Sequence, residues 1–259
     1  MGPLRDLPPS ADSVAKAGHA MFRDLVAALE GAWMVEADGA DAVVTGISST
    51  SANGVWTTEL DPDAGTVDGL LDRVAGTGLP HCLAVRGAGR AAGRVAERRG
   101  MVLESEEPVM ILTEGGALQA AIEASPDLSI RQLGSHEGGL HAAVAGAAFD
   151  ATPADFESLT TASVLSIAGR LCYVGAIEGV PVVTGTGVTL AGTTAIFAVA
   201  TRPEHRGRGY GAALTAFAVT DGLRAGARWA WLQSSPEGYR VYERLGFRTV
   251  ETGAIWATI

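Results

Sequence analysis

The chain has 259 residues, of which 47% are hydrophobic and 19% are charged, and its formal net charge at pH 7 is −10. This composition allows a sizeable core and excludes disordered, fibrous and collagen-like proteins. The net negative charge argues against non-specific electrostatic binding to the phosphates of nucleic acid, so we expect no nucleic-acid partner. The only two cysteines, Cys82 and Cys172, are far apart in the chain, which excludes a disulfide scaffold and a cysteine-rich zinc site.

Helices and short strands alternate through the first half of the chain, with Asn53-Gly54 as a turn signal between the first two strands. The helices are predicted at residues 13–29, 67–74 and 89–99, and the strands at 41–48, 54–59, 81–85, 101–104 and 109–113. The pattern weakens over residues 114–127, which read as a linker with a helical turn inside. We therefore expect two domains, residues 1–120 and residues 121–259.

Helices and strands are also mixed along the second half of the chain, and this order predicts an α/β or α+β fold. Its strands are predicted at residues 128–133, 171–177, 180–190, 194–201 and 229–233, with a final strand pair up to residue 259. Its helices are predicted at residues 137–148, from Pro153 onward, 209–224 and 236–244. The N-terminus lacks a signal peptide, and the most apolar stretch, residues 194–201, is too short to span a membrane. We expect a cytoplasmic protein with no membrane partner.

An internal repeat links the two halves. Residues 95–101 match residues 241–247 without a gap at an offset of 146, and the same offset places strand 81–85 beside residues 227–231. Each half then reads as a strand, a loop, a helix, a glycine and further strands. This order predicts two related units, each with a mixed sheet flanked by helices.

The loop after strand 194–201 has the chemistry of an anion site. Gly207, Gly209 and Gly211 let the backbone approach a ligand closely, and the helix that begins there directs unpaired N–H groups to the same place. Arg206 and Arg208 add positive charge, which opposes the helix dipole unless an anion offsets it. A pyrophosphate would fit these groups, but the spacing differs from the dinucleotide and ATP motifs, so neither NAD nor ATP is indicated. A glycine-rich helix entry that only turns the chain is the alternative.

A second motif lies in the helix predicted over residues 236–244. Ser235 is a suitable N-cap residue, with Pro236 at the first helical position. Gly246 is placed to end the helix, and Tyr239 and Tyr242 share one helix face. Both tyrosines are also typical of an ordinary amphipathic core position.

Together the two motifs resemble the GNAT superfamily of acyl-CoA-dependent N-acyltransferases. The segment Arg206-Gly207-Arg208-Gly209-Tyr210-Gly211 is similar to its pyrophosphate loop, and the segment from Tyr242 to Phe247 is similar to its Tyr-x-x-x-Gly-Phe element. The resemblance covers residues 128–259 and implies a GNAT fold. It implies acetyl-CoA as the acyl donor and a small-molecule or peptidic primary amine as the acceptor.

The resemblance also implies a role for particular residues. The backbone of Val199, Ala200 and Thr201 would hold the pantetheine arm as an added strand, and backbone N–H groups from Gly207 through Ala212 would hold the pyrophosphate. Tyr242 would act as general acid toward the departing thiolate, while the amine attacks directly. Ser235 stands where many relatives carry an asparagine, and we include it among the expected contacts to CoA.

A departure from the family's pattern leaves alternatives open. Strand 194–201 carries no carboxylate to accept the proton of the amine, and Glu178, Asp150, Asp155 and Glu157 are candidates by residue type only. The chain is thus a possible CoA- or effector-binding module without turnover, or an enzyme that uses a longer acyl-CoA. The histidines show no convincing metal-ligand spacing, so we expect no metal. The oligomeric state, monomer or homodimer, stays open.

The first half has no glycine cradle at the equivalent loop, residues 60–65, where Asp61 and Asp63 would repel a pyrophosphate. Ala96 takes the place of Tyr242. We therefore expect the first half to be a degenerate GNAT-like unit without an acyl-CoA site. It would either complete the fold or line the acceptor pocket with residues such as Trp33 and Trp56.

Overall fold

The computed structural model describes residues 8–258, except for the side chain of Asp155. It divides the chain into two compact units, which exchange segments rather than follow one cut in the sequence. The N-terminal unit contains residues 10–109, 234–236 and 249–258, and the C-terminal unit contains residues 110–233 and 237–248 together with Pro8 and Pro9. Each unit is a mixed sheet with helices on its faces, which confirms the predicted α/β class.

The N-terminal unit has the strand order β1-β2-β3-β4-β11-β5. Strands β3 and β4 run parallel, whereas β1 with β2, β2 with β3, and β11 with β4 run antiparallel. The elements are α1 (Ala11–Ala28), β1 (Trp33–Ala37), β2 (Ala40–Val44), the 3-10 turn Thr50–Ala52, β3 (Asn53–Thr57), α2 (Ala64–Ala75), β4 (Cys82–Val85), α3 (Arg90–Arg98), β5 (Val102–Leu112) and β11 (Arg248–Ala257).

The C-terminal unit has the strand order β5-β10-β9-β8-β7-β6, because the end of β5 belongs to it. Strands β9 and β10 are parallel, and β6, β7, β8 and β9 pair antiparallel in sequence order. The further elements are α4 (Leu118–Glu123), β6 (Ser129–Gln132), α5 (Gly138–Phe149), α6 (Ala154–Glu157), the 3-10 turn Ser158–Thr160, α7 (Ala162–Leu165), β7 (Arg170–Ile177), β8 (Val180–Leu190), β9 (Thr193–Thr201), the 3-10 turn Pro203–His205, α8 (Tyr210–Arg224), β10 (Trp229–Gln233) and α9 (Tyr239–Arg244).

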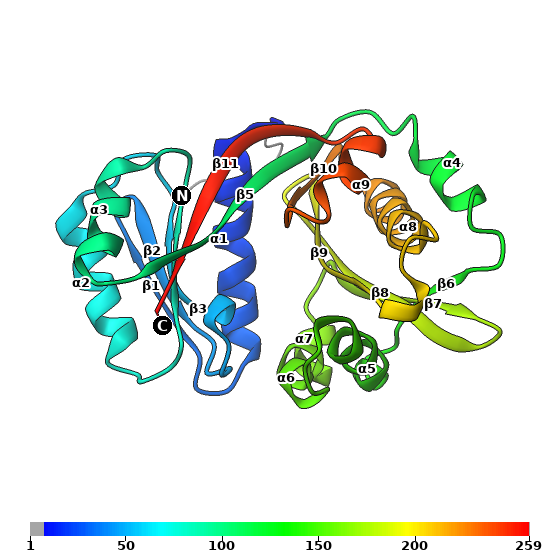
Figure 1. Ribbon diagram of the computed structural model, residues 1–259, viewed down its shortest axis with the longest axis horizontal. Helices are drawn as coiled ribbons and strands as arrows, with labels where there is room; N and C mark the ends of the chain where they lie inside the picture. The colour runs from blue at the N-terminus through cyan, green and yellow to red at the C-terminus, as the bar shows by residue number, and fades with distance from the viewer. Residues whose placement is uncertain (1–7, 259) are drawn as a thin grey trace. The chain divides into compact units, whose positions relative to one another are not determined.

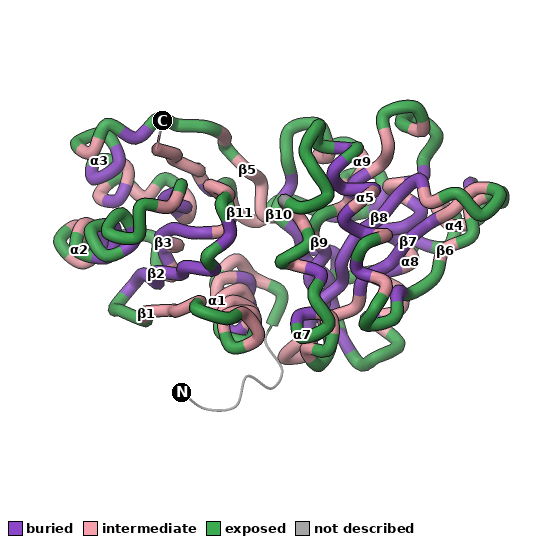
Figure 2. Tube along the Cα trace, turned by 90° about the horizontal axis from the view of Figure 1, so that it is seen from below, coloured by how far each residue is buried: buried purple, intermediate pink, exposed green. Residues whose placement is uncertain are grey.

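Helices cover both faces of each sheet (Figure 1). In the N-terminal unit, α1 lies on one face, and α2 and α3 bury their apolar sides on the other. In the C-terminal unit, α8 packs against β7, β8 and β9 on one face, and α5 packs on the opposite face. The middle strands, such as β2, β4 and β8, are therefore largely buried (Figure 2).

Asn53-Gly54 does not form the turn that the sequence predicts. Asn53 is fully buried, and its amide donates to the carbonyl oxygens of Ile47, Ser49 and Pro80, while its Oδ1 accepts from the backbone N–H of Thr45. A Cβ at position 54 would lie 2.2 Å from the carbonyl oxygen of Cys82 on β4. This dipeptide therefore begins β3 and allows its close approach to β4, and the turn lies before it.

The predicted repeat extends to whole elements of the structure. Ala64 and Tyr210, which begin α2 and α8, are 146 residues apart, and so are Val102 and Arg248, which begin β5 and β11. In both units a strand pairs antiparallel with its predecessor and parallel with the strand after the next helix. The same offset thus relates helix starts, strand starts and local topology.

The last strand of each half differs from the prediction. Residues 102–112 form the single strand β5 rather than two, because the polar residues 104–107 continue the strand, with Glu104 and Glu106 exposed and Ser105 and Glu107 half-buried. The chain likewise ends in one long strand, β11, and not in a strand pair among the described residues. Beyond Arg248 this strand belongs to the N-terminal unit, where it pairs with β4.

Ion pairs hold β11 in the N-terminal unit. The guanidinium of Arg86 at the end of β4 donates to both carboxylate oxygens of Glu251, at 2.8 and 3.0 Å, and also to Asp12 on α1. Both side chains of the Arg86–Glu251 pair are only 11% exposed.

None of the helices in residues 8–258 combines the length and apolar character that crossing a bilayer requires.

Candidate functional site

The candidate site begins where β9 and β10 stop pairing. Their parallel ladder joins only residues 193–195 of β9 to residues 229–231 of β10. A bulge then shifts the register of β8 and β9, so that Thr184 pairs with Ala200 and Thr186 with Phe197. The bulge in β9 contains Ala198, whose backbone lies in the left-handed region at φ 50°. A bulge bends and twists its strand. Ala200 and Thr201 pair with β8, Val199 lies in the bulge, and β10 pairs with none of the three.

The predicted pantetheine residues lie on this segment of β9. Val199 packs against the core beneath α8, and Ala200 is 4% exposed and faces Ala145 and Ala148 of α5. Position 185 of β8 has no room for a side chain, because a Leu214 methyl group lies 2.7 Å from the Cβ position of Gly185. The side chains of Val199 and Ala200 are thus committed to packing, and only their backbone groups are left for a ligand. The carbonyl oxygen of Thr201 already accepts a hydrogen bond from Arg206.

The loop after β9 turns through two left-handed glycines, Gly207 at φ 75° and Gly209 at φ 85°. A residue with a Cβ is disfavoured at such angles. Gly209 is the N-cap of α8, and it offers no side chain to cap this helix. Gly211 is already helical, and a Cβ there would meet Thr201 and Val199 at ordinary contact distances. The first two glycines are therefore required by the turn itself, whereas Gly211 is not.

A row of backbone donors stands at this helix start. The first amide with an intrahelical partner is that of Ala213, which bonds the carbonyl oxygen of Gly209. Among the described residues, no acceptor faces the N–H groups from Gly207 through Ala212. Free N–H groups at a helix N-terminus form a ready site for an anion. The backbone of residues 207–212 therefore fits a pyrophosphate.

Arg206 has a structural use in this loop. Its guanidinium donates to the carbonyl oxygens of Thr201 and of Ala148, the second at the end of α5. It therefore ties the loop to β9 and α5, which positions the glycine turn. Its charge still lies next to the row of N–H groups, and its Nε and Nη2 groups donate within the protein.

Tyr210 is also committed within the protein. Its side chain is buried, and its hydroxyl donates to Asp127 at 2.7 Å, a contact that raises the pKa of Tyr210. Only its backbone N–H is left for an anion. Ser125, in the same α4–β6 segment, has a buried hydroxyl that lacks a described partner and lies 3.6 Å from the Cβ position of Gly209. Sequence reasoning missed this segment because no local motif connects it to the loop.

Tyr242 on α9 is a neutral phenol in an apolar setting. It packs against the core of the C-terminal unit, and its ring meets Phe247 edge-on with centroids 6.0 Å apart. Burial raises the pKa of Tyr242 to about 12, so the hydroxyl keeps its proton at neutral pH. A protonated hydroxyl with no described hydrogen-bond partner is suited to donate a proton to a ligand.

Ser235 does not cap the tyrosine helix as the sequence predicts. Helix α9 begins only at Tyr239, with Gly238 as its N-cap, and residues 236–238 form a turn. Ser235 is exposed, and it belongs with Ser234 and Pro236 to the N-terminal unit. The buried Ser234 is held instead, since its N–H bonds the carbonyl oxygen of Pro108. The contact expected between Ser235 and CoA stays a prediction.

The acidic residues named from the sequence do not gather at one place. Glu178 lies in the turn between β7 and β8 at φ 49°, and Asp150 ends α5 at φ 53°. Both are outside the cores, Asp150 and Glu157 are exposed, and the side chain of Asp155 lies outside the described residues. The described residues contain no cluster of three metal-ligand side chains.

A buried histidine that the sequence does not single out lies behind β9. His141 on α5 is 3% exposed, and its Nδ1 lies 2.7 Å from Oγ1 of Thr184, the residue paired with Ala200. Because the Thr184 hydroxyl donates to the carbonyl oxygen of Tyr173, the imidazole Nδ1 must carry the proton and donate to Thr184. Burial lowers the pKa of His141 to about 4, so the ring is uncharged at neutral pH. A single histidine in an alanine-rich helix gave no sequence signal for this hydrogen-bond chain.

Comparison with known proteins points to one family. A family model for an acetyltransferase (GNAT) domain matches residues 168–249. No curated protein matches the sequence. Residues 168–249 include β9, the glycine loop, α8 and Tyr242, which are the elements of the site described above.

Solved structures resemble the whole chain. A GCN5-related N-acetyltransferase from Kribbella flavida has a TM-score of 0.72 at 23% identity, with 96% of each chain covered. One from Sphaerobacter thermophilus has a TM-score of 0.61 at 18% identity, covering 95% of this chain and 90% of that chain. A tandem GNAT protein from the clavulanic acid biosynthesis pathway has a TM-score of 0.56 at 13% identity, covering 100% and 90%. At such identities the likeness is one of fold, and it confirms the expected GNAT fold.

Proposed function

We propose, from the premise that this chain carries a GNAT-family acetyltransferase domain over residues 168–249, that the protein transfers an acetyl group from acetyl-CoA to a primary amine. The acceptor in this proposal is a small molecule or a peptide. The observation that carries the proposal is the row of unpaired N–H groups from Gly207 through Ala212, next to a segment of β9 that β10 leaves unpaired.

The donor would be held mainly by backbone groups. The N–H groups of residues 207–212 and the positive end of the α8 dipole suit the pyrophosphate. The backbone of Val199 and Ala200 would pair with the pantetheine amides as an added strand, since β10 has separated from β9 at that point. Arg206 supports this arrangement by its bonds to Thr201 and Ala148.

The chemistry would be a direct transfer. Bound acetyl-CoA supplies an activated thioester. In the proposed step, the amine nitrogen bonds to the acetyl carbon, the carbon–sulfur bond breaks and the amine gives up a proton to solvent water. Tyr242 donates its hydroxyl proton to the departing sulfur, which its raised pKa permits because the group is protonated at neutral pH. A covalent route through Cys172 is disfavoured because burial raises the pKa of this thiol.

The N-terminal unit has no acyl-CoA site in this proposal. At the position equivalent to Gly209 it carries Asp63, whose carboxylate accepts from the N–H of Thr66 at 2.8 Å and so caps its own helix α2. The helix start that would receive a pyrophosphate is therefore occupied by a charge of the same sign.

The test of the proposal is a thermal-shift titration with acetyl-CoA on wild type, Gly211→Glu and Gly211→Gln. Position 211 accepts a side chain, and a carboxylate in the first turn favours the helix, so all three proteins should fold. At 100 times its dissociation constant, acetyl-CoA should stabilise wild type by about 2.7 kcal/mol. The glutamate variant should lose the shift by repulsion, and the glutamine variant should keep more of it. Absence of a shift in wild type would contradict the proposal.

A second function, binding of CoA or another effector without turnover, is favoured by one observation. The nine residues of β9 include no carboxylate that could receive the amine proton. The two functions differ in thiol release, which free-thiol detection measures across a panel of amines. Acetyl-CoA stabilisation without thiol release would favour the binding function. Turnover with acetyl-, propionyl- and succinyl-CoA compared side by side would identify the preferred acyl donor.

A further inference from the structure

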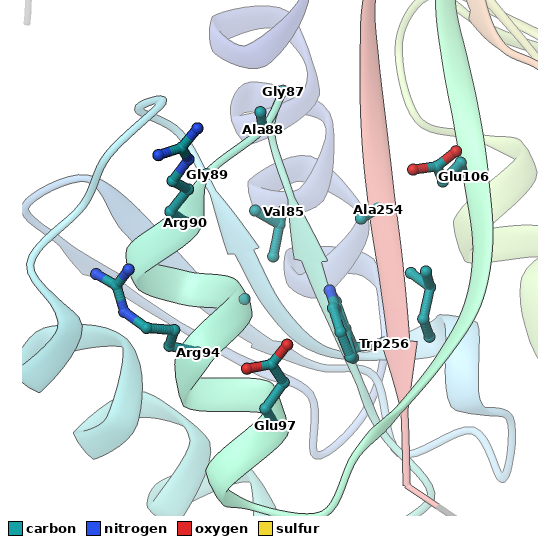
Figure 3. Close-up of a pocket in the computed structure, with 12 residues that line it drawn as sticks. Val85, Gly87, Ala88, Gly89, Arg90, Arg94, Glu97, Glu106, Ala254 and Trp256 are labelled. Carbon is teal, nitrogen blue, oxygen red and sulfur yellow. The ribbon is translucent and has the colours of Figure 1, made fainter.

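The N-terminal unit contains a pocket that none of the predicted acyl-CoA residues line. It has a volume of about 330 Å³ and lies between α3, the end of β4, and strands β5 and β11. Its apolar surface comes from Val85, Leu103, Ala254 and the indole of Trp256 (Figure 3). This volume is within the range of small-molecule sites.

Gly93 keeps this pocket open. It lies in the middle of α3, where a glycine costs about 1 kcal/mol of helix stability relative to alanine. The only heavy atom within 4 Å of its Cβ position is Cζ2 of Trp256, at 4.0 Å. Backbone strain does not require the glycine, since α3 is regular there. Its structural effect is to leave one side of the indole without a covering side chain.

The charges around the pocket are arranged unevenly about the indole. Figure 3 shows the carboxylate of Glu97 on the side of α3 that faces Trp256, and the carboxylate of Glu106 turned toward Ala254. The guanidinium groups of Arg90 and Arg94 are directed away from the indole. Neither Glu97 nor Glu106 has an ion-pair partner among the described residues. The space beside the indole is therefore negative, although the lining as a whole has equal numbers of both charges.

We propose that this pocket binds a small organic cation, an amine or quaternary ammonium with a flat or apolar body. The cationic head lies against Trp256 between the carboxylates of Glu97 and Glu106, and the body contacts Val85 and Ala254. An aromatic face attracts a cation, most strongly when the ring is tryptophan. An anion would meet two carboxylates there, and the net charge of −10 adds a long-range attraction for cations. The proposal does not depend on acetyl transfer.

The test uses the full chain labelled with ¹⁵N at its tryptophans. The Trp256 indole N–H signal is assigned by its loss in Trp256→Phe, and it is followed during titration with tyramine, agmatine and choline. The anion 4-hydroxyphenylacetate is the control for tyramine. We expect at least one of the cations to shift the signal saturably and the anion to leave it unchanged. Absence of a shift with all three cations, or an equal response to the anion, would overturn the proposal.

Variants then locate the binding. Gly93→Leu fills the space beside the indole, and Glu97→Gln combined with Glu106→Gln removes the negative charge. Each should weaken binding at least about tenfold. Gly93→Ala and Arg94→Gln are the matched controls for helix propensity and for a charge that points away, and neither should weaken binding. Equal binding by Gly93→Leu and the wild type would overturn the proposal. If Gly93→Leu fails to fold, the double glutamine variant at Glu97 and Glu106 is the decisive test.

Discussion

Helices α2 and α8 begin 146 residues apart, and the free N–H groups at their N-termini are treated differently. At α2 the unpaired N–H of Thr66 is satisfied by Asp63 from within the chain, at 2.8 Å. At α8 the equivalent position is Gly209, and the N–H groups that follow have no acceptor among the described residues. A carboxylate stabilises its own helix, and a glycine leaves the same dipole for a ligand. One residue thus separates a structural helix start from one that can bind an anion.

The largest effect is expected at Tyr242, whose counterpart in the N-terminal unit is Ala96. Tyr242→Phe should lower kcat about 10- to 1,000-fold, because the general acid is lost while packing is kept. Acetyl-CoA stabilisation should persist. Tyr239→Phe on the same helix is the control and should keep its turnover. Unchanged turnover in Tyr242→Phe would remove this residue from the mechanism and would weaken the contrast between the units.

A smaller effect is expected where the C-terminal strand enters the N-terminal unit. Glu251→Gln leaves the largely buried Arg86 without its main partner, although Asp12 and the carbonyl oxygen of Thr58 still accept from it. The free energy of unfolding should fall by about 2–3 kcal/mol, measured by urea denaturation. Glu243→Gln, at an exposed position of α9, is the control and should change little. Equal stability of the Glu251 variant would show that β11 is held by its backbone ladder alone.

The smallest effect is expected at the helix cap of α2. The hydrogen bonds from Thr66 hold the pKa of Asp63 below its usual value of 3.8, so the ionised carboxylate favours the folded state. This contribution to the free energy of unfolding is complete at a pH above the pKa of Asp63 in the unfolded chain. It is lost as the pH falls through the lower pKa of Asp63 in the folded protein. Asp63→Ala should therefore lower Tm by a few degrees at pH 7. The difference from wild type should shrink as the pH falls from about 4 toward 2, and a difference that is constant with pH would contradict this account.

Much of the fold could be predicted from the sequence because the signals are local. Hydrophobic periodicity predicted α1, α8, β7 and β8 to within a few residues of their observed ends. The glycine pattern likewise predicted the turn into α8, because a positive φ is a property of a single residue. The predictions were wrong where specific contacts override the local pattern. Asn53 looked like a turn residue, but its amide is held in a buried site by the carbonyl oxygens of Ile47 and Ser49, just before it, and of the more distant Pro80.

The candidate site shows the same division. The sequence predicted the row of backbone donors at residues 207–212, and within residues 8–258 these groups have no acceptors. The structure alone showed that Arg206 and the Tyr210 side chain are hydrogen-bonded within the protein. It also placed His141 behind β9 through Thr184, 43 residues away in the sequence. Such contacts depend on which elements pack together, and no local motif encodes them.

The sequence by itself determined most of the elements, the offset of 146 residues between the halves and the residue types at both helix starts. Only the tertiary structure decided which unit takes each final strand. Strand β11 follows α9 in the chain but completes the N-terminal sheet beside β4, and the end of β5 passes into the C-terminal unit beside β10. A strand carries the same alternation of side chains whichever sheet it joins. Its choice of neighbour is set by backbone pairing and by long-range contacts such as that between Arg86 and Glu251.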